Sequence, residues 1–266
     1  EFSGMDDGEG YKALNIVTQR HMRQGQFGKV YGGLGWQPQT DNVSFNPKYL
    51  VGGNINSFHN KQKITVLGLF NNINRQNFSF EDLLGVNSAS GRGGGQRGSN
   101  QFMVRPQAGV ALVNAVGVNY NDTWGRRKQV KFQGSYFFNN TDTQNLTEQE
   151  TWYETPSPID TLIKSSRTRS LNQNHRLNAR LDWKISQRQS LMSRTNLSFQ
   201  NNCNPKLGNT SEGFKFGQSG LTYINDATKR NSHGLFFSEF LQYRLRIGEK
   251  AGRTLSISGR FNLRDN

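Results

Sequence analysis

The feature that most limits what this chain can fold into is an alternation of apolar and polar residues at every second position. In residues 176–183, RLNARLDW, every second side chain is apolar, and the same pattern runs through 130–138, 191–200 and 255–263. A longer run, 110–124, keeps it with polar interruptions. This period is the signature of strands that bury one face. The runs extend to about 9–14 residues, which exceeds common soluble strands and suits tilted strands that cross a membrane.

The connections between these runs alternate between short and long. Four are short and basic: 59–62, 125–128, 184–189 and 248–253. Their centres lie near 61, 126, 187 and 250, so the spacings are about 65, 61 and 63 residues. The others are long and polar: 37–48, 75–109, 141–174 and 201–234. Short turns at one end and long loops at the other are typical of an outer-membrane β-barrel, whose tight turns face the periplasm.

The composition agrees with strands that each have one apolar face. Hydrophobic residues make up 33% and the mean hydropathy is −0.77, which is poor for a soluble protein with a buried core, while 11% aromatic residues argue against disorder. No apolar run is long enough for a membrane helix. The net charge of +14 fits nucleic acid, anionic lipid headgroups or an anion-attracting lumen, and charge alone does not choose among these partners.

The arginines of the strands fall in the polar phase. A Lys or Arg that faces lipid at the middle of the membrane costs roughly 2–4 kcal/mol, so we expect the polar phase to face a wet lumen. The candidate lumen-facing residues are Arg176, Arg180, Arg194 and Arg260. Glu239 breaks the rule because it shares the phase of Phe237 and Leu241. It either lies above the membrane or marks a β-bulge, and the sequence leaves both open.

Several segments resemble one family of membrane proteins. Residues 13–20, ALNIVTQR, resemble the segment that ends the plug of TonB-dependent receptors, an apolar-Asn-Ile-apolar-Thr-basic strand just before the barrel. Residues 25–33, GQFGKVYGG, look like a first barrel strand. The stretch from 71 to 140 and the motif at 152–158, WYETPSP, are similar to the barrels of such receptors. The resemblance covers nearly the whole chain and depends on the order and spacing of short motifs.

The resemblance implies a 22-stranded barrel with an N-terminal plug. It implies a transport protein of the Gram-negative outer membrane that imports a scarce nutrient, in contact with lipid and an inner-membrane energy-coupling protein, with a surface lipoprotein as a further candidate partner. On this basis 1–22 are the end of the plug and its linker, and 23–266 the N-terminal part of the transmembrane barrel. The sequence departs from the family in showing about nine antiparallel up-and-down strands, without most of the plug, the energy-coupling box or a terminal aromatic strand. We therefore expect a piece truncated from a larger all-β barrel, because nine strands leave open edges.

No motif predicts catalysis, so we do not expect an enzyme. Residues 93–98, GGGQRG, match G-x-G-x-x-G formally, but the surrounding Gly/Ser/Arg tract predicts a flexible linker and no cofactor site. The acidic residues at 6, 7 and 9 lack the spacing of a calcium loop, and the four histidines are scattered singly, so no metal is expected. Cys203 has no strong activator nearby.

Aromatic residues in the long connections are the candidates for contact with a ligand or partner. Loops held on a rigid scaffold often carry binding residues. The candidates are Phe78, Phe80, Phe102, Trp152, Tyr153 and Tyr223. The alternative is that these rings only pack the loops together.

The sequence thus predicts an outer-membrane transport protein for an unknown solute, which the lumen arginines bias towards anionic or hydrogen-bonding molecules. The alternative is a soluble all-β binding module such as a propeller or a lectin-like array, whose repeats would recur at about 40–50 residues. A basic nucleic-acid-binding protein is a third hypothesis, but no recognition motif supports it, and no nucleic-acid partner is expected.

Overall fold

A computed structural model describes residues 24–36, 38, 47–78, 104, 108–154, 161–215, 218–227, 229–248 and 253–265, with the backbone alone for 205–215 and 218–226. The expected plug segment, 1–22, and the linker at 93–98 lie outside the described residues. Among the described residues, no helix has the length and hydropathy needed to cross a membrane.

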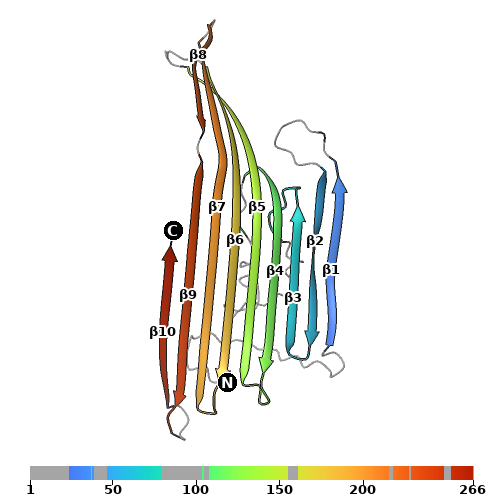
Figure 1. Ribbon diagram of the computed structural model, residues 1–266, viewed down its shortest axis with the longest axis vertical. Coiled ribbons are helices and arrows are strands. Elements are labelled where there is room, and N and C mark those ends of the chain that lie inside the picture. Colours follow the sequence, from blue (N-terminus) through green and yellow to red (C-terminus); the bar gives the residue numbers. More distant parts are fainter. Residues whose placement is uncertain are drawn as a thin grey trace.

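The described chain forms one antiparallel sheet of ten strands (Figure 1). The strands are β1 (Gln24–Gly35), β2 (Lys48–His59), β3 (Gln62–Asn71), β4 (Val110–Trp124), β5 (Val130–Trp152), β6 (Thr161–Lys184), β7 (Gln189–Lys215), β8 (Gln218–Ala227), β9 (Arg230–Arg246) and β10 (Thr254–Asp265). Nine follow one another as β1-β2-β3-β4-β5-β6-β7-β9-β10, and β8 pairs with β7 outside this path. The all-β class and the nine up-and-down strands are confirmed. The described sheet is open, with β1 and β10 at its edges.

Three of the four short connections, 59–62, 125–128 and 184–189, are described throughout, and they are tight turns that lie together at one end of the sheet (Figure 1). The fourth joins β9 to β10, and its residues 249–252 lie outside the described residues. At the second turn the Lys128 amide donates to the Gly125 carbonyl at 2.9 Å. Gly125 has a φ of 92° and Lys128 of 57°, in the left-handed region that glycine adopts most easily. The short turns predicted at 59–62, 125–128 and 184–189 are therefore confirmed.

Two of the four long polar connections are extended hairpins instead of loops. Segment 141–174 belongs mostly to β5 and β6, which pair as far as Trp152 and Thr161, and segment 201–234 contains the rest of β7 and β8. These hairpins project beyond the other strands (Figure 1). Arg169 on β6 donates to both carboxylate oxygens of Asp142 on β5, at 3.0 and 2.6 Å. The loop prediction was wrong here. It identified strands by the alternation of apolar residues, whereas the backbone groups of a polar hairpin pair without such an alternation.

The register brings the apolar phases of all nine sequential strands onto one face, which we call the apolar face. Side chains of directly paired residues lie on the same side of a sheet. One such row consists of Gly28, Ile55, Val66, Val118, Tyr136, Leu177, Leu197, Phe237 and Leu263. The neighbouring row, one residue along each strand, lies on the opposite, polar face. It consists of Phe27, Asn56, Thr65, Asn119, Ser135, Asn178, Asn196, Ser238 and Asn262.

The exposure of the two rows is opposite to that of a soluble sheet. On the polar face, Asn56 and Thr65 are 0% exposed and Asn119 is 1% exposed, whereas Leu177 and Leu197 on the apolar face are each 38% exposed. The Thr65 hydroxyl donates to the Asn56 side-chain oxygen at 2.7 Å, which pairs these two buried polar groups across β2 and β3. Soluble folds cover their apolar faces with a second layer, and among the described residues no such layer lies on this face.

Candidate functional site

The apolar face carries a band with aromatic side chains at both boundaries. At the short-turn end, one row contains Trp124, Val130, Trp183, Leu191, Tyr243 and Ile257. At the other end, Phe138, His175 and Phe199 form a row, with ring centroids 4.9 and 6.0 Å apart between neighbours. Val130 and Phe138 lie eight positions apart on β5, which corresponds to roughly 27 Å at about 3.4 Å per residue.

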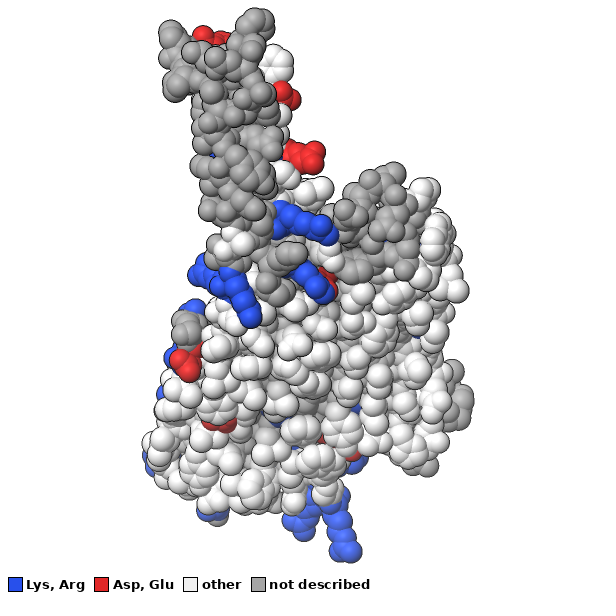
Figure 2. Space-filling view, turned by 45° about the horizontal axis from the view of Figure 1, so that its top comes forward, with Lys and Arg blue, Asp and Glu red and all other residues white. Residues whose placement is uncertain are grey.

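On β4 to β9, polar residues begin as soon as this band ends. Across these strands the next row on the same face consists of Asn114, Asn140, Gln173, Asn201 and His233. Figure 2 shows a surface on which most residues are uncharged, with Lys and Arg at its lower edge and near mid-height, below the part that projects upwards. In the β2–β3 turn, partial desolvation and the charges of Lys128 and Lys131 lower the pKa of Lys61, as expected where several basic turns meet.

Glu239 lies inside the band, and β9 has no bulge there. Its pairing with Thr195 on β7 and with Phe261 on β10 continues an unbroken register. The hydroxyls of Ser193 and Thr195 donate to its two carboxylate oxygens at 2.7 and 2.5 Å. The bulge interpretation was therefore wrong. A polar side chain in an apolar surrounding is tolerated when neighbouring groups satisfy it, and two hydroxyls on the adjacent strand do so here.

The register brings three of the four candidate arginines into one row on the polar face. Arg180 on β6 is the partner of Arg194 on β7, which pairs with Phe240 on β9, and Phe240 pairs with Arg260 on β10. Arg180 donates two hydrogen bonds to Asp182, at 2.8 and 3.1 Å. The Arg260 guanidinium lies 5.5 Å from the centre of the Phe240 ring. Arg176 lies on the same face, four residues from Arg180 on β6.

Phe78 packs against the polar face of the sheet. It is 4% exposed in a cluster with Leu67, Leu69, Ala111, Val113, Ala115 and Phe137. Its ring meets that of Phe137 edge-on, with the ring centroids 6.2 Å apart. This is the packing alternative that the sequence left open, because a buried ring offers no surface to a ligand.

Asparagine side chains hold the start of the β3–β4 connection in place beside Phe78. The Asn71 side-chain oxygen accepts from the amides of Ile73 and Arg75, at 3.3 and 3.0 Å. Asn77 exchanges two hydrogen bonds with the backbone of Val104, at 3.0 and 2.7 Å. Both ends of this connection are thereby fixed over the polar face.

Two of the other aromatic candidates, Trp152 and Tyr153, lie apart from the cluster around Phe78. Trp152 is the last residue of β5, at the end of the projecting hairpin, and is 73% exposed. Tyr153 follows it and is 42% exposed. Tyr223 lies in β8, where only the backbone is described. Phe80 and Phe102 lie outside the described residues.

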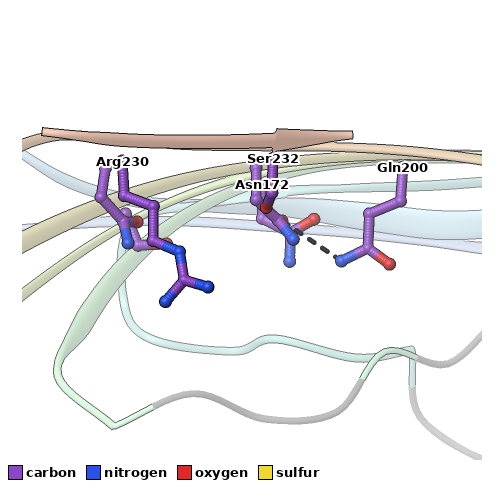
Figure 3. Close-up of a pocket in the computed structure, with 7 residues that line it drawn as sticks. Asn172, Gln200, Arg230 and Ser232 are labelled. Carbon is purple, nitrogen blue, oxygen red and sulfur yellow. Dashed lines mark hydrogen bonds between the residues drawn. The ribbon is translucent and has the colours of Figure 1, made fainter. Parts of the chain in front are cut away.

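A hollow on the polar face contains residues that the sequence analysis did not select (Figure 3). Its volume is about 270 Å³, and its lining residues are Ser170, Asn172, Gln200, Asn202, Asn204, Arg230 and Ser232. They come from β6, β7 and β9. A signal was present, because amide and hydroxyl side chains recur at every second position in 170–174 and 200–204. We assigned these segments to loops and so missed their shared face.

The described residues contain no cluster of His, Cys, Asp or Glu that could hold a metal ion. The acidic residues at 6, 7 and 9 lie outside this part of the chain. No protein-family model matches the sequence, and no curated protein shows significant similarity to it.

Proposed function

We propose that this sheet forms part of the wall of an outer-membrane β-barrel that transports a solute, with its apolar face towards lipid and its polar face towards the interior. The observation that carries the proposal is the inverted exposure of the two faces. Leu177 and Leu197 remain exposed while their neighbours Asn178 and Asn196 on the polar face are half-buried, and Asn56, Thr65 and Asn119 of the same polar row are buried. Lipid is a medium in which an exposed leucine costs nothing and an exposed asparagine is unfavourable.

The dimensions of the band support lipid as the partner of the apolar face. Barrel strands carry an outward apolar band about 25 Å tall between two girdles of aromatic residues. The band here measures roughly 27 Å along the strands, and the tilt of barrel strands shortens its height across the membrane. Trp124 and Trp183 lie at the boundary next to the short turns, where interfacial aromatic side chains belong.

The edges of the sheet require further strands in this setting. Unpaired backbone groups of an edge strand cost several kcal/mol each in lipid, and closure of the sheet removes them. We therefore propose that additional strands pair with β1 and β10 to close the barrel. The polar face, with its row of arginines, then lines the interior. A receptor of the TonB-dependent type, which imports its solute with the help of an inner-membrane energy-coupling protein and no catalytic chemistry, fits this layout best.

A soluble all-β module is the rival proposal, and it requires a second layer of structure to cover the apolar face. A propeller or sandwich packs each sheet about 10 Å from another sheet. Strands of 23 to 27 residues, as in β5, β6 and β7, are also far longer than the strands of such modules, which usually have about 5–6 residues.

Fractionation of cells that make the full-length protein tests the proposal. The protein is expected in the outer-membrane fraction, to need detergent for extraction, and to migrate differently in gels before and after boiling, because a closed barrel resists unfolding by detergent until heated. Recovery in the soluble fraction without detergent, together with heat-independent migration, would refute it.

A further inference from the structure

The hollow on the polar face lies where the apolar band ends. Its lining residues on β7 and β9 lie in three rows of paired residues: Asn174–Gln200–Gly234, Asn172–Asn202–Ser232, and Asn204–Arg230. On the opposite face, the boundary row of the band contains His175 and Phe199, next to Asn174 and Gln200 along their strands. The hollow therefore lies at the base of the projecting hairpins, on the side of the molecule away from the short turns (Figure 1).

The side chains of the hollow retain hydrogen-bonding capacity of both kinds. Asn174 donates to the Asn172 oxygen at 2.8 Å, and Gln200 donates to the Asn202 oxygen at 3.2 Å. Each amide has donors and an acceptor. After these two bonds are made, the side-chain nitrogens of Asn172 and Asn202 and the side-chain oxygen of Gln200 are still available for hydrogen bonding. Within the described part of the chain, no other side chain forms a hydrogen bond with these three atoms. Ser170 and Ser232 add hydroxyls that can donate and accept.

Arg230 supplies the only charge among the lining residues, since the other six are neutral amides and hydroxyls. Its side chain is exposed and projects from the sheet on the same side as Asn172, Gln200 and Ser232 (Figure 3). Its guanidinium makes no ion pair with a described carboxylate, unlike Arg169 and Arg180. A guanidinium that has no such ion pair can bind a carboxylate or phosphate through two parallel hydrogen bonds.

An aromatic side chain lies on the same face of β9, four residues beyond Ser232 of the hollow. Gly234 pairs with Gln200 and leaves that position of the face without a side chain. Phe236, the next residue of β9 on the polar face, is 42% exposed. Its ring offers an aromatic surface of the kind against which the C–H groups of a ring-shaped solute pack.

We propose that the hollow binds a polyhydroxylated solute that carries one anionic group on each sugar unit, with the chemistry of a uronic acid. The amides and hydroxyls match the hydroxyl groups of the solute, since each of these can donate and accept. Arg230 binds the carboxylate, and a volume of about 270 Å³ accommodates roughly one sugar unit at a time. The proposal rests on the proposed function only for the route by which the solute reaches the hollow.

The test is calorimetric titration of the full-length protein, purified in detergent, with a short oligogalacturonate. A neutral malto-oligosaccharide of equal length, a cationic chitosan oligomer and sodium sulfate serve as comparison ligands. We expect binding of the uronate oligomer, much weaker binding of the neutral oligomer, and none of the cationic one. Sulfate that binds as tightly as the uronate would contradict the proposal, because the site would then recognise an anion without its hydroxyls.

Two variants locate the binding site. Arg230→Gln is expected to weaken uronate binding about ten- to hundredfold, in line with the loss of a charge-assisted pair. Arg244→Gln is the matched control, because Arg244 is also an exposed arginine on the polar face of β9. It lies fourteen residues away, or roughly 48 Å along the strand. Equal effects of the two variants, or none from either, would overturn the assignment.

The fractionation result keeps this proposal separate from the proposed function. A heat-modifiable outer-membrane protein that binds no uronate would refute the site and leave the transport proposal standing. A soluble protein in which Arg230→Gln abolishes uronate binding would refute the transport proposal and leave the site standing.

Discussion

Replacing Leu177 and Leu197 together by Arg is expected to prevent assembly of the barrel. The two residues are direct partners on β6 and β7 and lie on the apolar face within the band. An arginine that faces lipid costs up to about 2–4 kcal/mol, depending on depth, and two adjacent ones also repel each other. The measurement is the fraction of full-length protein that reaches the outer membrane in heat-modifiable form, which we expect to fall to near zero.

The matched control places the same two arginines on the opposite face. Asn178 and Asn196 are also direct partners on β6 and β7, one residue along from the leucines. Asn178→Arg with Asn196→Arg is expected to leave most of the protein assembled, since Arg180 and Arg194 already occupy this face two residues away. Equal loss of assembly in both double variants would contradict the proposal that only the apolar face is in contact with lipid.

Replacing Phe78 by Ala is expected to lower the free energy of unfolding by about 3–5 kcal/mol, the usual cost of truncating a buried aromatic side chain. Phe78 fills a cluster between β3, β4 and β5 and is 4% exposed. Its loss leaves a cavity next to Leu69 and Phe137 and detaches the β3–β4 connection from the polar face. The measurement is urea unfolding of the full-length protein refolded into lipid vesicles.

Trp152→Ala is the control for that experiment. Trp152 is a large aromatic residue but is 73% exposed at the end of β5, so its truncation is expected to change the unfolding free energy by less than about 0.5 kcal/mol. If Phe78→Ala has an equally small effect, the β3–β4 connection does not pack on the sheet in the way described.

Much of the sheet could be predicted from the sequence because an apolar phase marks each central strand. Segments 130–138, 176–183 and 191–200 are strands with the expected faces. Where both faces of a strand are polar, no apolar alternation indicates a strand. For this reason the sequence predicts loops for β8 and for the outer parts of β5, β6 and β7. In the structure these segments are strands because they pair with each other across the hairpins, and this pairing does not require an apolar face.

The candidate sites could be predicted less completely, because they depend on register. Alternation placed Arg180, Arg194 and Arg260 on the polar face, but their alignment in one row depends on where each turn closes. The same holds for Arg230 and Asn204, which are direct partners although 26 residues apart. Glu239 also depends on register. The sequence places it in the apolar phase, and it is tolerated within the apolar band because Ser193 and Thr195 of the neighbouring strand donate hydrogen bonds to its carboxylate.

The central claim is that the two faces of this sheet meet different media. The most direct test is a nitroxide scan of residues 191–200 on β7, in full-length protein in lipid vesicles with Cys203 replaced by Ser. We expect odd-numbered positions to be relaxed by oxygen, which concentrates in lipid, and even-numbered positions by a water-soluble nickel complex. Uniform relaxation along the strand, or odd positions that respond to nickel, would contradict the account.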